Sequence, residues 1–510
     1  MDWLKKLEKI LSNEKLIFYV SVTAGIVFSL LSVIFIYDIY RDVANVYAYN
    51  AREIANGNFA EGWESRVPML NILLAGGISF CGVDPYRATV VVSSLFFVLT
   101  LFPLRRYLEL FLTPLQSAWG CLLFITAPKI IRFSVSGMID SSRYFFLITS
   151  LLLLFQLREK PRIGKAVLFG LSLAGLSVSR GEELVFAVAI LIGLPVLTFL
   201  KSPDLFRSEF KKRTAVLGIS AFFFLAAVSP FCTVNACRGG AFITDVRIAE
   251  AMGFKSDRRS PEKTLSETNQ PAYKDGRQFK HSFSSVLRGG YELYWVFSIF
   301  GMFLLLRKRN WKWEHTVLTG VFLAHTAIYY LIGSAYRYSL YLIPMFMPFT
   351  MTGLGFFCVL PQKMNWSERV RLTAVAAVFV LMCLIFGIQI RNGMEIVFAR
   401  KDKWIRQVAD TMIQWGRKNV PDRRLRVASF GLVEAVYWSG AYSVFNYKDG
   451  VQDMKHFRDF DLLLIPESHL AEISERRDLR PVPLPAPKKR PRDASDRYYL
   501  FCRENRMEGK

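Results

Sequence analysis

Apolar segments that approach the length of a membrane span dominate the chain, and short polar connections separate them. About 20 apolar residues cross the roughly 30 Å of hydrocarbon in a bilayer. In hydrocarbon each backbone N–H and C=O must pair within its own segment, which predicts helices, and the short alternating segments of a barrel are not seen. We therefore expect a polytopic α-helical membrane protein with about eleven transmembrane helices. The predicted spans are 16–37, 88–104, 117–131, 142–157, 164–178, 184–200, 215–231, 291–306, 317–332, 340–360 and 372–390.

The basic residues of the connections alternate between the two ends of the predicted helices. With the N-terminus inside, every inner connection carries several Lys or Arg residues. The short outer turns carry only Arg132, Arg143, Arg180 and Arg337. An excess of Lys and Arg marks cytoplasmic loops. We therefore expect a cytoplasmic N-terminus and, from the odd number of spans, a C-terminal region on the periplasmic or extracellular side.

Three longer segments lie on the predicted outer side. Residues 38–87 are expected to form two amphipathic helices, RDVANVYAYNAREIANG and PMLNILLAGGISFCG, and residues 232–290 a polar, basic loop. Beyond the last span, a helix over 402–417 is followed by the strand-like stretches RLRVASFG, YSVFNY, DLLLIPE and RYYLFCR, with helical signals between the first three. This alternation predicts a small α/β domain. We expect a transmembrane module over 1–392 and a periplasmic α/β domain over 393–510.

Composition agrees with a membrane protein and narrows its partners. Hydrophobic residues make up 52% of the 510 residues, and the formal net charge is +23. A nucleic-acid partner does not follow from this charge, because the basic residues track the topology of the spans. Anionic lipid headgroups are the expected partner of the charge. The compact loops favour a bacterial inner (plasma) membrane, and the first apolar run lacks a cleavage site and is expected to remain as a span.

Cysteine and histidine do not form a metal-type pattern. The seven cysteines lack ligand spacing, and the five histidines are scattered. Cys232 and Cys237 either form a disulfide in an oxidising compartment or pack as two small residues at a span end. His325, inside an apolar span, is expected to be a packed, hydrogen-bonded residue. We expect no cofactor, although converging carboxylates leave a divalent metal open as an alternative.

Charged residues gather at the outer ends of the predicted spans. A single charge at a span end is commonly a snorkelling anchor. Here, however, every short outer turn carries a charge and both signs occur, which favours a functional site. The residues concerned are Asp38, Arg41, Asp42, Arg66, Asp140, Arg143, Arg180, Glu182, Glu183, Tyr336 and Arg337.

This set of side chains suits displacement at a sugar carbon that is attached to a lipid phosphate. A carboxylate can take or orient the proton of an acceptor hydroxyl. Arginines can hold the phosphate through charge-assisted contacts and stabilise the charge of the leaving group. We expect Asp42, Asp140, Arg180 and Arg337 to share one water-accessible hollow at the outer rim, where a greasy carrier enters sideways from the bilayer.

Four stretches on the predicted outer side carry a resemblance to a known family. They are YDIYRDVANVYAYNAREIANGNF with RVPMLNILLAGGISFCGVDPYRA, then SVSGMIDSSRYFF, LSVSRGEELVF and AYRYSLYLIPMFMPF. In order and common side they resemble the C-type (GT-C) integral-membrane glycosyltransferases, particularly the branch of protein O-mannosyltransferases and lipid A aminoarabinose transferases. The resemblance covers essentially the whole chain. It implies a GT-C-like fold and transfer of a hexosyl or pentosyl group from a polyprenyl phosphate carrier to a lipid, glycan or protein on the periplasmic face.

The resemblance also implies roles for individual residues. The catalytic aspartate, a general base, corresponds to Asp42, with Asp38 as the competing assignment. Arg66 and Arg337 would contact the phosphate of the carrier, and the acidic members of the binding set would support them. No metal is implied for catalysis in this branch. The predicted substrate-binding residues are Arg66, Asp140, Arg143, Arg180, Glu182, Tyr336 and Arg337.

Two features depart from the family pattern, and two other classes of protein compete with an enzyme: a transporter or flippase, and a membrane-embedded scaffold in an envelope-assembly complex. Members often have two adjacent acidic residues where this chain has Arg41 and Asp42, and a longer proline-bearing run where it has Pro68. The first alternative is a transporter or flippase of a lipid-linked or small anionic substrate. Such proteins favour charges near the bilayer midplane and broken spans in two related halves, and neither feature is evident in the sequence.

Overall fold

The chain folds into two compact units in a computed structural model. The first unit comprises Met1–Ile36, Asn50–Asp257 and Tyr273–Phe398, and the second Tyr37–Tyr49, Arg258–Ala272 and Ala399–Lys510. The structure describes residues 2–36, 39–40, 42–65, 67–181, 183–201, 209–239, 242–244, 292–332, 339–363, 367–398, 403–429, 432–446, 460–467, 470, 473, 476, 478–485 and 497–503.

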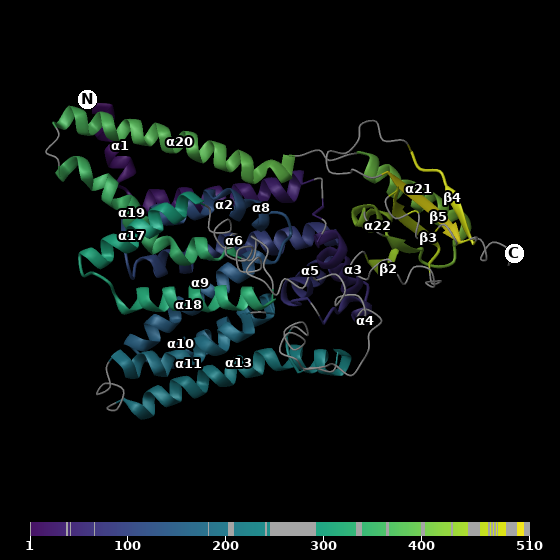
Figure 1. The fold of residues 1–510 in the computed structure, drawn as a ribbon, viewed down its shortest axis with the longest axis horizontal. Helices are drawn as coiled ribbons and strands as arrows, with labels where there is room; N and C mark the ends of the chain where they lie inside the picture. Colours follow the sequence, from purple (N-terminus) through teal and green to yellow (C-terminus); the bar gives the residue numbers. More distant parts are fainter. Residues whose placement is uncertain are drawn as a thin grey trace. The chain divides into compact units, whose positions relative to one another are not determined.

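The first unit is built from helices (Figure 1). Its first half contains α1 (Asp2–Leu11), α2 (Glu14–Phe35), α4 (Phe59–Gly62), α5 (Leu70–Phe80), α6 (Pro85–Leu108), α7 (Pro114–Thr126), α8 (Pro128–Ser134), α9 (Asp140–Glu159) and α10 (Ile163–Ser179). It continues with α11 (Glu183–Lys201), α13 (Phe210–Gly239), α17 (Glu292–Arg307), α18 (Trp313–Ile332), α19 (Leu342–Lys363) and α20 (Glu368–Phe398). Helix α3 (Ala48–Ala55) begins in the second unit and ends in the first.

Each predicted apolar span coincides with a helix, with one break. The segment 117–131 is divided between α7 and α8, because Pro128 lacks an N–H and disfavours helical geometry at the residue before it. Ala127 accordingly has an extended backbone (φ −63°, ψ 120°). By length and composition, three helices of the described chain are able to cross a membrane, Glu14–Phe35, Pro85–Leu108 and Phe210–Arg238.

The first long outer segment contains more elements than the two predicted helices. The first predicted helix is a π-helical turn, η1 (Val43–Tyr47), that continues into α3. The short α4 then precedes α5, which matches the second predicted helix. Gly57, two residues after the end of α3, has a φ of 83°, a conformation that L side chains rarely adopt.

Helix α13 extends beyond the predicted span end at residue 231. It places Cys232 and Cys237 on one continuous helix, and no disulfide joins these two residues. Residues five positions apart on a helix do not face each other, so the disulfide alternative is wrong. Most of the predicted loop 232–290 lies outside the described residues.

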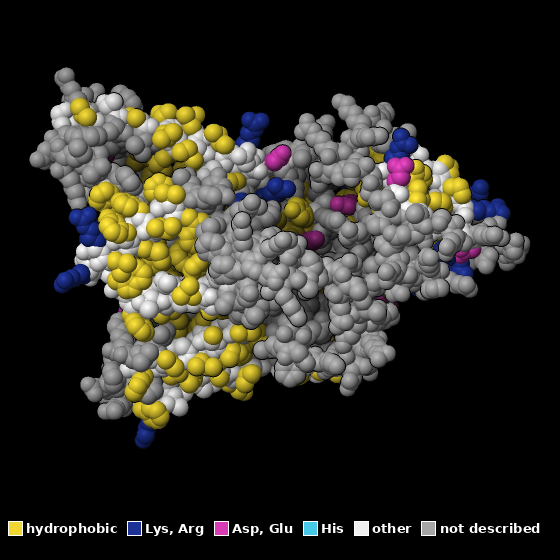
Figure 2. Space-filling model, viewed as in Figure 1, with side chains coloured by type: hydrophobic (Ala, Val, Ile, Leu, Met, Phe, Trp, Pro, Cys, Tyr) yellow, Lys and Arg dark blue, Asp and Glu magenta, His cyan; other side chains and the backbone are white. Residues whose placement is uncertain are grey.

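The surface of the first unit is rich in exposed apolar side chains. Figure 2 shows hydrophobic side chains gathered over the helical bundle. Patches of this extent are rare on soluble monomers, and lipid is the solvent in which they are stable. Side chains that are more than half exposed include Tyr19, Leu30, Phe222, Leu225, Val296, Ile299, Leu384 and Ile388.

Helices α17 and α19 approach each other closely through two glycines. A Cβ on Gly301 would lie 2.0 Å from the carbonyl oxygen of Phe349, and a Cβ on Gly353 would lie 2.3 Å from that of Phe297. Small residues are used in this way at helix interfaces in membranes, where close backbone packing takes the place of hydrophobic association.

The second unit contains a five-stranded sheet with helices α21 (Lys403–Asn419) and α22 (Val433–Ser439). The strands are β1 (Arg426–Ser429), β2 (Tyr442–Asn446), β3 (Leu462–Pro466), β4 (Leu479–Val482) and β5 (Tyr498–Arg503), in the order β2-β1-β3-β5-β4. Strand β1 pairs parallel with β2 and β3, whereas β5 pairs antiparallel with β3 and β4. The predicted α/β character is present, and β4 is a strand that the sequence pattern did not indicate.

The central strand β3 is buried on both faces of the sheet. Leu462 and Leu464 pack with Val408 and Met412 of α21, whereas Leu463 belongs to a second cluster on the opposite face. Successive side chains of a strand point to opposite faces, so a continuous apolar run such as LLLIP marks a strand covered on both sides.

Carboxylates fix the ends of this sheet. The Asp461 side chain is buried, accepts two hydrogen bonds from the Arg423 guanidinium and accepts the backbone N–H of Arg426 at 2.9 Å. Asp478, beside β4, accepts from Nε of Arg476 at 2.9 Å and has Arg503 of β5 at 3.5 Å. The hydrogen bond from Arg476 is the main cause that lowers the pKa of Asp478 below its ordinary value.

We predict that Gly301→Ala destabilises the helical unit by about 1–3 kcal/mol, because the new methyl group overlaps the backbone of α19. Gly320→Ala on α18 is the matched control, since a Cβ there meets no heavy atom within 4 Å. Thermal unfolding of both variants in the same detergent measures the difference. Equal melting temperatures would show that α17 and α19 are not in this close contact.

We predict that Asp478→Asn reduces the acid sensitivity of the sheet. A lowered folded-state pKa means that Asp478 stabilises the fold above its ordinary pKa of 3.8 and loses that contribution as the pH falls below it. The protection factors of amides in β4 and β5, which correct for the intrinsic pH dependence of exchange, should therefore fall less on acidification in this variant than in the wild type. Asp422→Asn, in the exposed turn before β1, should leave the pH profile unchanged.

Candidate functional site

A buried cluster of charged side chains lies where α9, α10 and α11 meet within the first unit. Asp140 is the first residue of α9, and the turn before it is allowed by Gly137, whose φ is 81°. Arg180 caps α10 with an extended backbone, and Glu183 begins α11 three residues later. The partial positive charge of a helix N-terminus favours the carboxylates at both helix starts.

The first contact of the cluster is a buried ion pair between Asp140 and Arg180. Nη1 of Arg180 donates to Oδ1 of Asp140 at 2.7 Å. Asp140 is 1% exposed and Arg180 is 5% exposed. This pair therefore connects the start of α9 to the end of α10 away from bulk water.

The second contact joins Arg143, one turn further along α9, to Glu183 of α11. Their side chains form an ion pair, and both are fully buried. His325 of α18 completes the group, with its Nε2 3.3 Å from Oε1 of Glu183 and 3.5 Å from Nη2 of Arg143. The tautomer of His325 decides whether its Nε2 donates to Glu183 or accepts from Arg143.

Two aromatic rings pack against this group, one from the start of α11 and one from the residue before α19. The Arg143 guanidinium lies 4.2 Å from the ring centroid of Tyr341, a cation–π contact. The ring of His325 stacks on Phe186, with centroids 3.3 Å apart. The rings close off one side of the ion pairs and hold the imidazole in a single orientation.

The cluster is formally balanced, since two arginines face two carboxylates. Burying an ion requires several kcal/mol, and the gain from a buried pair commonly does no more than offset that cost. Such pairs are therefore a weak means of stabilising a fold, and charges at membrane depth are by default functional. The arrangement is suited to holding oriented, water-shielded charges next to a bound ligand.

Several buried polar atoms beside Asp140 lack a partner among the described residues. Oδ2 of Asp140 makes no hydrogen bond, and neither do the hydroxyls of Ser134, Ser136 and Ser141. A buried unsatisfied group costs about 1–3 kcal/mol. A ligand or water with hydroxyl groups would satisfy these atoms, so this turn between α8 and α9 is the part of the cluster suited to binding.

The structure brings together three of the predicted site residues, Asp140, Arg143 and Arg180. Asp42 belongs to the second unit, where it is half-buried at the N-terminus of η1 and does not cap that helix. The remaining predicted residues, Asp38, Arg66, Glu182, Tyr336 and Arg337, lie outside the described residues. The expectation of a shared hollow that includes Asp42 and Arg337 stays a prediction.

Two members of the cluster, Glu183 and His325, were not among the predicted substrate-binding residues, although Glu183 belongs to the charged residues singled out at the outer ends of the spans. The sequence places Glu183 at the start of an apolar helix, which is a signal of the same kind that selected Asp140. His325 is packed and hydrogen-bonded as expected, but its partners come from helices about 140–180 residues earlier in the chain, which local pattern cannot show. Within the described part of the chain, no group of three or more His, Cys, Asp or Glu residues has the geometry of a metal site.

We predict that Arg143→Met and Glu183→Leu each destabilise the protein by about 3–5 kcal/mol, because each leaves one buried charge unpaired. The double variant should be more stable than either single variant, since it removes both charges. The free energies of unfolding of the wild type, the two single variants and the double variant, measured in detergent, form a double-mutant cycle. The exposed pair Arg106–Glu109 is the control, with an expected coupling below about 1 kcal/mol, and similar coupling at both pairs would contradict the prediction.

Solved structures with a similar fold include those of two proteins, ArnT and AglB. ArnT from Cupriavidus metallidurans aligns with a TM-score of 0.60 in its structure bound to undecaprenyl phosphate, and 0.58 in the apo state. Both alignments have 12% identity and cover 95% of this chain and 97% of that one. The archaeal oligosaccharyltransferase AglB from Archaeoglobus fulgidus, solved with an inhibitory peptide and a dolichol-phosphate, aligns with a TM-score of 0.51 and 13% identity, over 88% of this chain and 69% of that one.

No protein-family model and no curated protein matches the sequence. ArnT and AglB are both C-type glycosyltransferases. The similarity extends over most of the chain in each alignment, and it confirms the resemblance at the level of the fold. The protein therefore has the fold seen in ArnT and AglB.

Proposed function

We propose that the protein transfers a sugar from a polyprenyl phosphate carrier to an acceptor at the outer face of the bacterial inner membrane. The observation that carries this proposal is the fold, which matches one protein solved with undecaprenyl phosphate and another solved with a dolichol-phosphate. The buried charges at the start of α9 support it, because displacement of a lipid phosphate needs oriented groups of both signs away from bulk water.

The position of the cluster along α9 supports the choice of the outer face. The other end of α9 leads into the basic connection that holds Arg158, Lys160, Arg162 and Lys165. Lys and Arg mark cytoplasmic connections. The start of α9, with Asp140, then faces the periplasmic or extracellular side, and the C-terminal α/β region is proposed to lie on that side as well.

In the proposed mechanism Asp42 takes the proton of the acceptor hydroxyl, and Asp38 is the competing base. Arg66 and Arg337 hold the carrier phosphate and stabilise the charge that develops as the bond to the sugar breaks. The proposal needs no bound metal, because the arginines supply the positive charge that the leaving phosphate requires.

The described cluster supplements these roles. Arg180 and Arg143 already face Asp140 and Glu183, so we assign them to orienting those carboxylates rather than to the phosphate. Arg180 donates to Oδ1 of Asp140, whereas Oδ2 has no hydrogen-bond partner among the described residues. Oδ2 can therefore accept a hydrogen bond from a hydroxyl of the donor sugar. Glu182 and Tyr336 complete the proposed binding set.

We predict that Asp42→Asn reduces transfer by at least about 100-fold, the contribution of a general base, while binding of the carrier is retained. Purified protein is incubated with labelled polyprenyl phosphate sugars and candidate acceptors, and binding of the carrier is measured in parallel. Asp38→Asn tests the competing assignment. Asp84→Asn is the matched control, because Asn also caps a helix start and Asp84 caps α6.

The two measurements separate an enzyme from a transporter. Loss of transfer with intact binding supports the proposed base. If no protein of the series removes sugar from any carrier, while carrier movement across a vesicle membrane is detected, the transferase proposal is wrong and the flippase alternative holds.

A further inference from the structure

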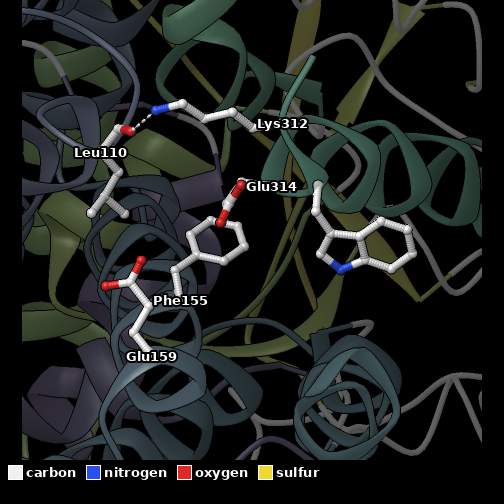
Figure 3. Close-up of a pocket in the computed structure, with 6 residues that line it drawn as sticks. Leu110, Phe155, Glu159, Lys312 and Glu314 are labelled. Atoms are coloured by element: carbon white, nitrogen blue, oxygen red, sulfur yellow. Dashed lines mark hydrogen bonds between the residues drawn. The ribbon is translucent and has the colours of Figure 1, made fainter. Parts of the chain in front are cut away.

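A polar cavity lies within the first unit, at the opposite end of α9 from the charged cluster. It has a volume of about 310 Å³ and is lined by Leu110, Phe155, Glu159, Lys312, Trp313 and Glu314. These residues come from the segment after α6, from the end of α9 and from the start of α18 (Figure 3). A volume of this size is at the lower end of the range of about 300–1,000 Å³ for ligand sites.

The length of α9 separates this cavity from the candidate transfer site. Asp140 and Glu159 are the first and last residues of the helix, and a rise of 1.5 Å per residue places them roughly 28 Å apart. That distance is close to the thickness of the hydrocarbon core, about 30 Å. The cavity therefore lies at the membrane face opposite to that of the charged cluster, and it cannot be a subsite of that cluster.

The carboxylates of the cavity differ in how they are paired. Glu314 accepts a hydrogen bond from Nη2 of Arg158, and both side chains are largely buried. Glu159 has the same Arg158 nitrogen only at 4.0 Å, and its side chain is 64% exposed. The partial negative charge at the C-terminus of α9 adds to the carboxylate of Glu159. This side of the cavity favours a cation.

Hydrogen-bond donors lie on the residues from the start of α18. Nζ of Lys312 donates to the carbonyl oxygen of Leu110 at 2.8 Å, at one edge of the cavity in Figure 3. An ammonium has three donors, so two remain for a ligand. The indole Nε1 of Trp313 is buried and has no partner among the described residues. An indole N–H can only donate, so an acceptor on a ligand would satisfy it. These two groups favour an anion beside the cation.

We propose that this cavity binds a primary ammonium group linked to a phosphate, as in the phosphoethanolamine headgroup of an inner-leaflet phospholipid. The carboxylate of Glu159 accepts hydrogen bonds from the ammonium, with Glu314 contributing negative charge behind it. Lys312 donates to the phosphate, and the Trp313 indole lines the cavity as a further donor. Trp at a membrane surface occupies the headgroup level, which suits an occupant that is itself part of the bilayer.

The proposal is independent of the transfer reaction and is tested by lipid binding. Purified full-length protein is placed in phosphatidylcholine nanodiscs with increasing fractions of phosphatidylethanolamine or phosphatidylglycerol, and its melting temperature and retained lipid are measured. Phosphatidylethanolamine should be retained and should raise the melting temperature. Choline carries no N–H donor and glycerol no positive charge, so neither of the other lipids should do so.

Variants locate the binding. Glu159→Gln and Lys312→Gln should each weaken retention of phosphatidylethanolamine roughly ten-fold, the effect of losing one charge-assisted hydrogen bond. Glu395→Gln on α20 and Lys308→Gln after α17 are the matched controls, because both residues are exposed and do not line the cavity. Controls and cavity variants that behave alike would overturn the proposal, as would equal retention of the ethanolamine and choline lipids.

A further arm distinguishes the source of the headgroup. Soluble phosphoethanolamine is added to the protein in pure phosphatidylcholine nanodiscs. Stabilisation by the soluble compound that Glu159→Gln abolishes would assign the cavity to a free metabolite with the same chemistry and would overturn its assignment to a lipid. No effect of the soluble compound, together with retention of the lipid, supports the lipid assignment.

Discussion

The pairing of buried charges is the constraint on which the helical unit depends. The bundle is apolar enough to be stable in lipid, yet the start of α9 holds Asp140 and Arg143 at almost no exposure. Each can be there only because a partner from another helix, Arg180 or Glu183, neutralises it. The pairs consequently fix how α9, α10 and α11 meet, and His325 extends the constraint to α18. The same ion pairs that make up the candidate site therefore also hold these helices together.

The sequence predicted the helices well because the bilayer leaves few alternatives. A long apolar segment must be helical in hydrocarbon, and Lys and Arg in the connections report which end is inside. The strands of the second unit followed for a related reason, since an uninterrupted apolar run such as LLLIP matches a strand covered on both faces. Strand β4 was not predicted because LRPV is short and alternates too little between apolar and polar residues. Its pairing with β5 depends on tertiary contacts rather than on its own sequence pattern.

The candidate site was only partly predictable for a different reason. Asp140, Arg143 and Arg180 stand out because each is a charge beside an apolar helix. Which charges pair, and whether His325 joins them, depends on helix packing between segments far apart in the chain. The cavity around Glu159 and Lys312 has the same origin. Its residues looked like ordinary topology signals, and only the meeting of three helix ends gives them a shared space.

The proline break between α7 and α8 leaves a backbone carbonyl of α7 without its usual helical donor, and a side chain of α17 bonds to it instead. Because Pro128 has no N–H, the Ala127 N–H turns to the carbonyl of Phe124, and the carbonyl of Leu123 loses its usual helical donor. Two hydroxyls approach this carbonyl instead. Tyr294 on α17 donates to it at 3.1 Å, and Thr126, on α7 itself, donates at 3.4 Å. During synthesis α7 therefore has only the long contact from Thr126, whose hydroxyl also donates to Leu122 at 2.8 Å, until α17 is made and Tyr294 supplies the shorter bond.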